Sequence, residues 1–177
     1  VGLFGDIGRN LVNLLDAVRR RPPDRDAVAR RTVAAAGASK SRRAAQQRGA
    51  AAARTAGQIT PALVAAELGE LLPPDFVFVD ETISNRPSFI TALDFGDPLA
   101  YFAANGLSLG YSGGAAVGMQ LALPHRRVVS VVGDGSLLYY PHALWNAANL
   151  RLPVLFVVLN NGSYRVLKLI VERMGGP

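Results

Sequence analysis

The chain has 177 residues, of which 50% are hydrophobic and 18% charged, enough for one domain with a substantial core. It contains no cysteine, which excludes disulfide frameworks and thiolate metal sites. The formal charge is +6, but residues 19–57 hold eleven Lys and Arg against two Asp and no aromatic residue, which favours a solvated linker over a nucleic-acid surface.

No apolar run approaches the roughly 20 residues of a membrane span, and no signal peptide precedes the first charges. We therefore expect a cytoplasmic protein with neither a membrane nor a nucleic acid as partner. The chain starts at Val1 rather than Met and ends just after a helix-like run, so we also expect it to be part of a longer protein.

The first elements expected along the chain are a short strand, a loop and a helix that ends before Pro22-Pro23. Leu11, Leu14, Leu15 and Val18 follow the three-to-four-residue spacing of a helix with one apolar face. Residues 24–57 are rich in Ala and Arg and have no large apolar face. This composition predicts a partly helical connector.

A second domain is predicted to begin near Gln58, with Thr60 as helix cap and Pro61 as first helical residue. Its strands are apolar throughout and alternate with helices, which predicts an α/β domain: a parallel sheet with helices on both faces. Small residues in the helix within 107–124 should let another backbone pack closely. The expected strands are 76–80, 127–135 and 153–162, and the later helices are 137–150 and 163–174.

Two polar motifs follow consecutive strands of this predicted sheet. GDG at 133–135 ends one strand, and NN at 160–161 ends the next. Ligands of open α/β sheets bind beyond the carboxyl ends of the strands, so Asp134 and Asn161 should converge there. Their oxygens suit Mg²⁺ or Ca²⁺. Gly133 and Gly135 would let backbone approach a phosphate, and Ser136 at the following helix start offers hydroxyl and N–H donors. The residues alone therefore indicate a metal-bridged diphosphate site.

The pair of motifs, GDG followed by NN with 24 residues between them, resembles the cofactor motif of thiamine-diphosphate-dependent enzymes. "FVFVDETISNRPSF" and "NGLSLGYSGGAAVGMQLALP" precede it in the order and spacing seen in the benzoylformate decarboxylase and acetolactate synthase group. The resemblance implies a thiamine-diphosphate-binding fold truncated at its C-terminus. It also implies that residues 1–18 are a remnant of a central domain, 19–57 a basic Ala/Arg-rich linker and 58–177 an incomplete thiamine-diphosphate-binding domain.

The resemblance also implies roles for individual residues. Asp134 and Asn161 match the family's metal ligands, and Ser163 would add its backbone carbonyl. Further cofactor contacts would come from side chains and backbone around the two motifs. For the diphosphate these are Ser84, Gly133, Gly135 and Ser136. For the rest of the cofactor they are Leu109, which wedges beneath it, the Leu107 carbonyl, which accepts a hydrogen bond from its aminopyrimidine, and the Tyr164 ring, which closes the site.

The implied activity is thiamine-diphosphate- and Mg²⁺-dependent decarboxylation of a 2-oxo acid and/or carboligation of the resulting enamine. The catalytic glutamate is expected on an absent N-terminal pyrimidine-binding domain of its own or a partner subunit, in a homodimer or homotetramer, so the chain alone should be inactive. Leu167 stands where pyruvate decarboxylase-like enzymes carry glutamate, which favours an apolar substrate pocket walled by Val166 and Leu167. The alternatives are an acetolactate synthase-type transferase, a non-catalytic metal-diphosphate binding module, and a Rossmann-like domain using GDG for a ribose.

Some conspicuous residues are not assigned to the chemistry. His142 is interpreted as a helix-surface or interface residue and His125 as a loop residue. Trp145 is expected to pack against the sheet. Asp80 and Glu81 are adjacent at a strand end and should point to different sides, so we expect one to cap the loop rather than both to share acid–base catalysis.

Overall fold

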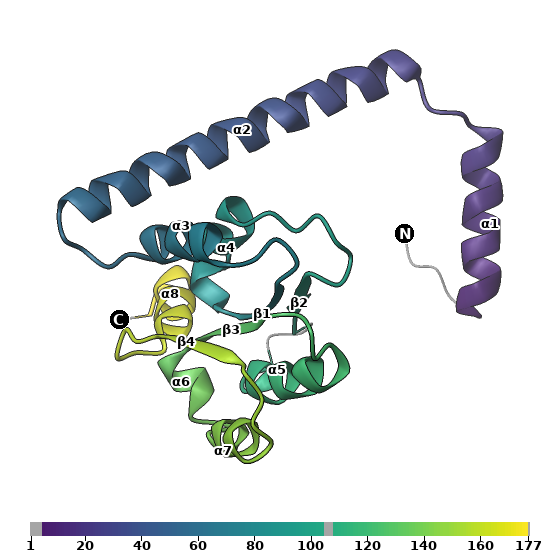
Figure 1. Ribbon diagram of the computed structural model, residues 1–177. Coiled ribbons are helices and arrows are strands. Elements are labelled where there is room, and N and C mark those ends of the chain that lie inside the picture. The colour runs from purple at the N-terminus through teal and green to yellow at the C-terminus, as the bar shows by residue number, and fades with distance from the viewer. Residues whose placement is uncertain (1–4, 105–107, 177) are drawn as a thin grey trace. The chain divides into compact units, whose positions relative to one another are not determined.

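The computed structural model describes residues 5–104 and 108–176, and the chain divides into two compact units, Val1–Arg42 and Arg43–Pro177 (Figure 1). The first unit contains helix α1 (Ile7–Arg20) and the start of α2 (Arg25–Thr55). Asp6 caps α1 by accepting a hydrogen bond from the Arg9 amide at 2.8 Å. The helix ends before the two prolines, as predicted, whereas the strand expected ahead of it falls in residues 1–4, outside the described residues.

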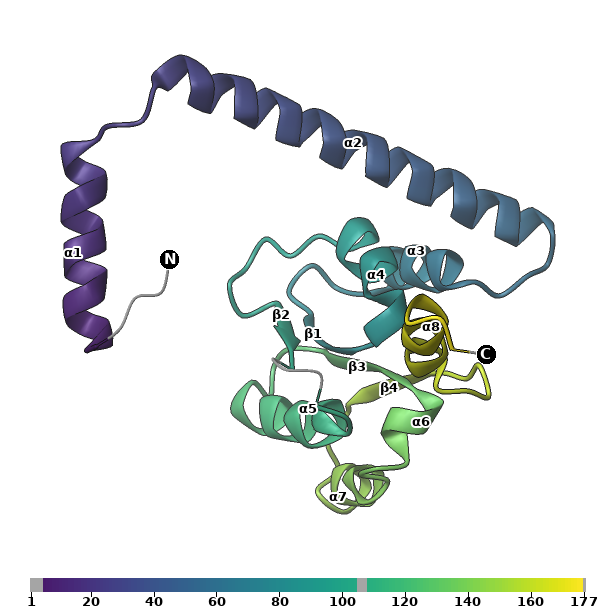
Figure 2. The ribbon, with the colours of Figure 1, turned by 180° about the vertical axis from the view of Figure 1, so that it is seen from behind.

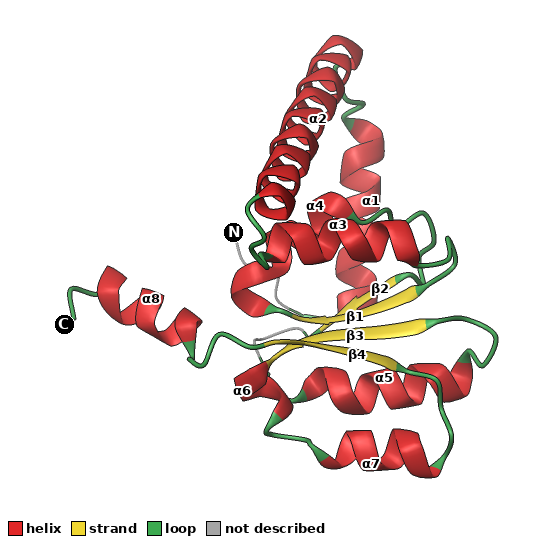
Figure 3. Cartoon of the chain, turned by 60° about the vertical axis from the view of Figure 1, so that its left-hand side comes forward, coloured by secondary structure: helices red, strands yellow, loops and turns green. Residues whose placement is uncertain are grey.

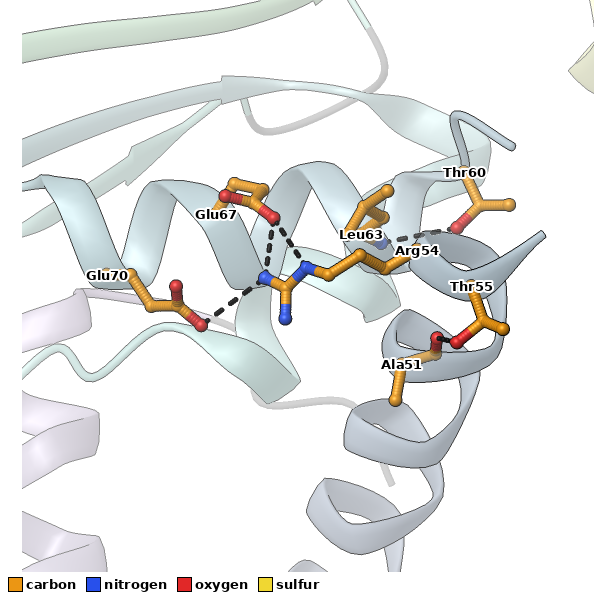
Figure 4. A network of polar contacts seen from close by, with 7 residues as sticks. All are labelled: Ala51, Arg54, Thr55, Thr60, Leu63, Glu67 and Glu70. Atoms are coloured by element: carbon orange, nitrogen blue, oxygen red, sulfur yellow. Dashed lines mark hydrogen bonds and ion pairs between the residues drawn. The ribbon is translucent and has the colours of Figure 1, made fainter. Parts of the chain in front are cut away.

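The predicted connector contains one continuous helix, α2, of 31 residues. Its last turns belong to the second unit, where Ala50 and Ala53 are buried. Arg54 reaches Glu67 and Glu70 of the next helix, with a hydrogen bond of 3.1 Å from its Nε to Glu67 (Figure 4). These contacts connect the end of α2 to α3 (Pro61–Leu71).

Helix α3 begins as the sequence predicts. The Thr60 hydroxyl accepts a hydrogen bond from the Leu63 amide at 3.2 Å, and Pro61 occupies the first turn. Pro61 suits that turn because its missing N–H would have had no partner within the helix.

The sheet of the second unit has four parallel strands in the order β2-β1-β3-β4. This arrangement confirms the predicted α/β class. Helices α3 and α4 (Arg86–Ala92) cover one face, and α5 (Tyr111–Ala122) and α7 (His142–Asn149) cover the other (Figures 2 and 3). The strands are β1 (Val77–Glu81), β2 (Tyr101–Ala103), β3 (Val128–Gly133) and β4 (Leu155–Leu159).

Strand alternation divides the core between the two faces. Phe78 and Val129 pack under α3 and α4, whereas Val77 and Val79 pack against α5. On α5, a Cβ placed on Gly113 would lie 2.9 Å from the Cβ of Ala143, so this glycine allows α5 and α7 to approach closely. The prediction that small residues serve close packing is confirmed.

Two predictions about elements need correction. The single helix expected over 137–150 is divided into α6 (Asp134–Leu137) and α7, with Pro141 immediately before α7. Trp145 does not pack into the sheet, because 65% of its surface is exposed. The short elements β2, α4 and the 3-10 turn Ile83–Asn85 were not predicted, and the last helix, α8, spans Arg165–Arg173.

Within the described residues, no helix is both long enough and apolar enough to cross a membrane.

Candidate functional site

A cavity of about 160 Å³ lies at the carboxyl ends of the strands. It is lined by the segments that follow β1, β3 and β4 and by the first residues of α8. Every predicted cofactor or metal residue that the structure describes lies in this lining. These residues are Ser84, Leu109, Gly133, Asp134, Gly135, Ser136, Asn161, Ser163 and Tyr164. Leu107 falls in residues 105–107, outside the described part of the chain.

The two motifs are brought together by the register of β3 and β4. Gly133 pairs with Leu159, so the residues that follow these two positions leave the sheet side by side. Asp134 comes directly after Gly133, and Asn160 and Asn161 come directly after Leu159. The expectation that GDG and NN meet at one edge of the sheet is confirmed.

The NN loop is ordered by its own side chains. Asn160 Oδ1 accepts a hydrogen bond from the Gly162 amide at 3.0 Å, and Asn161 Oδ1 accepts one from the Ser163 amide at 2.9 Å. Gly162 has φ of 61°, a conformation that glycine adopts without strain. These bonds fix the turn that carries Asn161 and the Ser163 backbone into the cavity lining.

The oxygens at this edge fit a divalent cation. The half-buried carboxylate of Asp134 has no hydrogen-bond or ion-pair partner among the residues that the structure describes. It lines the same cavity as Asn161 and Ser163, which can offer an amide oxygen and a backbone carbonyl. No group of three or more His, Asp or Glu side chains suited to a metal occurs in 5–104 and 108–176. A metal here would therefore rely on one carboxylate and neutral oxygens, a donor set that suits Mg²⁺ when phosphate oxygens complete it.

Gly135 and Tyr164 form one wall of the site. A Cβ on Gly135 would lie 2.6 Å from Cε1 of the Tyr164 ring, so the ring occupies the space that a side chain at position 135 would need. Val166 and Leu167 also line the cavity, as expected for the walls of an apolar pocket. Leu109 contributes from the loop before α5.

Sequence reasoning missed a buried network at the end of β1. Asp80 is fully buried and accepts hydrogen bonds from Arg86 Nε at 3.0 Å and from the Tyr101 hydroxyl at 2.5 Å. It also accepts bonds from the Thr82 amide and hydroxyl, at 2.8 and 2.7 Å. Burial raises the pKa of Tyr101 above its usual range, and the hydrogen bond to Asp80 adds to this. Asp80 therefore caps the loop after β1, as expected for one of the two adjacent acids.

The loop that Asp80 holds is itself part of the cavity. Thr82, Ile83, Ser84 and Asn85 all line it. Ile83 has φ of 43°, which is unfavourable for a β-branched residue and persists where surrounding contacts enforce it. A strained residue beside Ser84 is consistent with a loop shaped for a ligand.

Neither histidine contributes to this cavity. His142 is exposed on α7 with its ring 5.3 Å from the ring of Tyr140, and His125 is exposed in the loop before β3. Both placements agree with the interpretation from sequence.

Gly110, next to Leu109, provides the first stability prediction. Its φ is 85°, and a Cβ there would overlap the Tyr140 ring and lie 2.7 Å from the Cβ of Tyr139. Gly110→Ala should therefore lower the free energy of unfolding by about 2 kcal/mol through backbone strain and overlap. Urea denaturation followed by circular dichroism measures this change.

The matched control is Gly118→Ala in the same region. Gly118 is exposed within α5, and a Cβ there would meet no heavy atom within 4 Å. Alanine at this position should be neutral or stabilise the chain by up to about 1 kcal/mol, because it is the better helix former. Equal effects of the two substitutions would contradict the role assigned to Gly110.

A parallel α/β sheet with its cavity at the carboxyl ends of the strands places the second unit among the ligand-binding α/β domains. Comparison with known families is more specific. Residues 87–176 match the "Thiamine pyrophosphate enzyme, C-terminal TPP binding domain", and the chain belongs to this family.

Individual relatives agree with this assignment. Benzoylformate decarboxylase of Pseudomonas aeruginosa is 41% identical over 114 residues, covering 63% of this chain and 21% of the relative. Acetolactate synthase isozyme 3 large subunit of Escherichia coli is 34% identical over 106 residues, covering 59% of this chain and 18% of the relative.

Among solved structures, the thiamine diphosphate-dependent 4-hydroxybenzoylformate decarboxylase of Rhodococcus jostii RHA1 is similar in fold. Its TM-score is 0.64 at 35% identity, over 66% of this chain and 22% of that protein. The present chain therefore spans about a fifth of the length of these relatives.

Proposed function

We propose that this chain is the diphosphate-binding part of an enzyme that uses thiamine diphosphate and Mg²⁺ to decarboxylate a 2-oxo acid, to join the product to an acceptor carbonyl, or both. The observation that carries the proposal is the cavity at the sheet edge, which gathers every described residue predicted for the cofactor and the metal. Family membership supports thiamine diphosphate as the ligand.

In this proposal Asp134 provides the charged metal ligand. Asn161 adds its amide oxygen and Ser163 its backbone carbonyl, both from the loop that the two Asn-centred hydrogen bonds hold in shape. Asn161 Oδ1 already accepts the Ser163 amide, and its second lone pair is free to face a cation. The diphosphate oxygens would then contact the backbone around Gly133, Gly135 and Ser136, with Ser84 reaching them from the loop after β1.

The remaining predicted residues would hold the organic part of the cofactor. Leu109 would support it from below, the Leu107 carbonyl would accept a hydrogen bond from its aminopyrimidine, and Tyr164 would cover it. Bound thiamine diphosphate supplies the electron sink for the carbanion that remains when a 2-oxo acid loses carbon dioxide. The residues of this chain would orient that group and exclude water around it.

The proposed substrate is a 2-oxo acid with an apolar side chain. Leu167 and Val166 give the cavity apolar walls, and the similarity to two decarboxylases of benzoylformate type supports this substrate class. An acetolactate synthase-type transfer is the second candidate, supported by the 34% identity to the E. coli synthase subunit. A non-catalytic module that holds a metal-diphosphate ligand is the third.

We further propose that the catalytic glutamate comes from an N-terminal pyrimidine-binding domain of the same or a partner subunit, in a cytoplasmic homodimer or homotetramer. The chain's span of about a fifth of its relatives supports a role for other domains. The 177 residues alone should then bind cofactor without turning over any 2-oxo acid.

Calorimetric titration of the 177-residue chain with thiamine diphosphate, with and without Mg²⁺, tests the proposal. Binding that depends on Mg²⁺ is the expected result. A folded chain that binds neither thiamine diphosphate nor the Mg²⁺ complex would refute the site. Release of carbon dioxide from benzoylformate or pyruvate by this chain alone would refute the proposal that catalysis needs a glutamate from another domain.

A further inference from the structure

Glu81, the last residue of β1, links two distant parts of the chain. It is 2% exposed, and both of its carboxylate oxygens accept backbone hydrogen bonds. Oε1 accepts from the Gly110 amide at 2.5 Å and Oε2 from the Ser112 amide at 2.7 Å. The two donors lie 29 and 31 residues further along the chain, at the start of α5.

Helix α5 lacks a cap of its own. Its N-cap position is Gly110, which has no side chain, and its first turn contains no acidic residue. The positive φ of Gly110 and the overlap that any Cβ would cause there exclude the usual capping residues Ser, Thr, Asp and Asn. Because the first N–H groups of a helix have no partner within it, the cap must come from elsewhere. Glu81 supplies it from the neighbouring strand.

The same contact stabilises the buried carboxylate of Glu81. No Lys, Arg or His is paired with this buried carboxylate among the described residues. Two N–H groups at the positive end of a twelve-residue helix take the place of a cation. A neutral side chain of the same shape could not satisfy both donors, since an amide has one acceptor oxygen.

This cap lies against the cavity. Glu81 belongs to the cavity lining, and so does Leu109, the residue immediately before the capped Gly110. A bond that holds Gly110 to the end of β1 therefore restricts where Leu109 can lie. It does so independently of Asp80, whose partners lie at Thr82, Arg86 and Tyr101.

We propose that Glu81 is a positioning residue: its carboxylate caps α5 from the end of β1 and thereby holds Leu109 in place for the cofactor. The part that concerns the cofactor rests on the proposed function, whereas the cap does not. Asp80 holds the loop on one side of the cavity, and Glu81 holds the start of α5 on another.

The cap can be tested without ligand by amide hydrogen exchange, measured by NMR on the 177-residue chain. Glu81→Gln keeps the shape and loses one acceptor, so protection of the Gly110 or the Ser112 amide should fall about tenfold. The amides of Val79 and Val131, within β1 and β3, serve as internal references and should keep their protection. Glu67→Gln, the same change at a partly exposed residue of α3 that lies outside the cavity lining, should alter none of these amides.

The outcomes of the exchange experiment are distinct. A local loss in Glu81→Gln, with unchanged references, supports the cap. Unchanged protection at Gly110 and Ser112, or an equal fall at all four amides, would overturn it, since the second result is general destabilisation. Glu81→Ala should extend the loss to both amides, and if that variant fails to fold, Glu81→Gln still decides.

The positioning role is tested by calorimetry with thiamine diphosphate and Mg²⁺. Glu81→Gln should raise the dissociation constant about tenfold, and Glu67→Gln should leave it unchanged. Wild-type binding with no difference in Glu81→Gln would overturn the positioning role and leave the proposed function intact. Absence of binding by the wild-type chain would overturn both, while hydrogen exchange would still report on the cap.

Discussion

Asp134→Ala is expected to raise the dissociation constant for thiamine diphosphate in the presence of Mg²⁺ by about 100-fold or more. Asp134 is the one acidic side chain in the cavity lining without a partner among the described residues, because the carboxylate of Glu81 is already held by two amides. Without it, the neutral oxygens of Asn161 and Ser163 would have to hold a doubly charged ion whose hydration is costly to remove.

The fold should survive this substitution. Asp134 is half-buried and its carboxylate accepts no hydrogen bond that the structure describes, so its removal leaves no buried group unsatisfied. Thermal unfolding of the unliganded variant should match that of the wild type within about 2 °C. The predicted loss thus belongs to binding rather than to folding.

Isothermal titration with and without Mg²⁺ measures the effect. Asp94→Ala removes an exposed carboxylate outside the cavity lining and serves as the matched control, with no change expected. Asp134→Asn keeps the shape and removes the charge, and it should lose most of the Mg²⁺ dependence. If Asp134→Ala bound the magnesium complex as tightly as Asp94→Ala does, Asp134 could not be a metal ligand.

The meeting of GDG and NN at one edge of the sheet could be predicted from sequence because its signals are local. GDG and NN each follow an apolar strand directly, and consecutive strands joined by a helix became neighbours in the sheet with Gly133 opposite Leu159. The register then brought Asp134 and Asn161 to one edge without any further information. The same holds for the Thr60 cap and Pro61, which depend on residues within one turn.

The features that were missed depend on partners far apart in the chain. Strand β2 has three residues and owes its place to pairing with β1, where Tyr101 lies beside Phe78. Glu81 and Gly110 are 29 residues apart, and nothing in either segment alone indicates that they meet. Trp145 follows a plausible helical spacing but lies outward, since periodicity does not say which face of a helix meets the sheet.

Asp80→Ala is expected to lower the free energy of unfolding by about 3 kcal/mol or more, the largest stability effect predicted for this chain. The Asp80 carboxylate is fully buried, and its loss leaves both Arg86 and the Tyr101 hydroxyl without their present hydrogen-bond acceptor. The exposed third of the Arg86 side chain can regain some water, which keeps the expected loss near the lower end for a broken buried pair.

Urea denaturation with Asp97→Ala as the control separates burial from pairing. Asp97 also pairs with an arginine, at 2.8 Å from Arg126, but it lies half exposed at the surface. Its removal should cost about 1 kcal/mol, because the Asp97 carboxylate is half exposed and Arg126 keeps its hydrogen bonds to the carbonyls of Asp75 and Phe76. Similar losses in the two variants would show that the Asp80 network adds no stability beyond that of a surface pair.

Alkaline titration gives a second reading of the same network. Burial, and then the hydrogen bond to Asp80, raises the pKa of Tyr101, so folding favours the neutral phenol. That contribution is complete below about pH 10, the value for an unfolded tyrosine, and falls as pH rises beyond it because the unfolded chain then binds fewer protons. Asp80→Asn should reduce this alkaline loss, since burial alone would then hold the phenol neutral.

Without the Asp80 carboxylate, the loop that keeps Ile83 at a positive φ would also lose its anchor, and Ser84 would no longer be held toward the cavity. Stability and cofactor affinity should therefore fall together in Asp80 variants, whereas in Asp134 variants only affinity should fall.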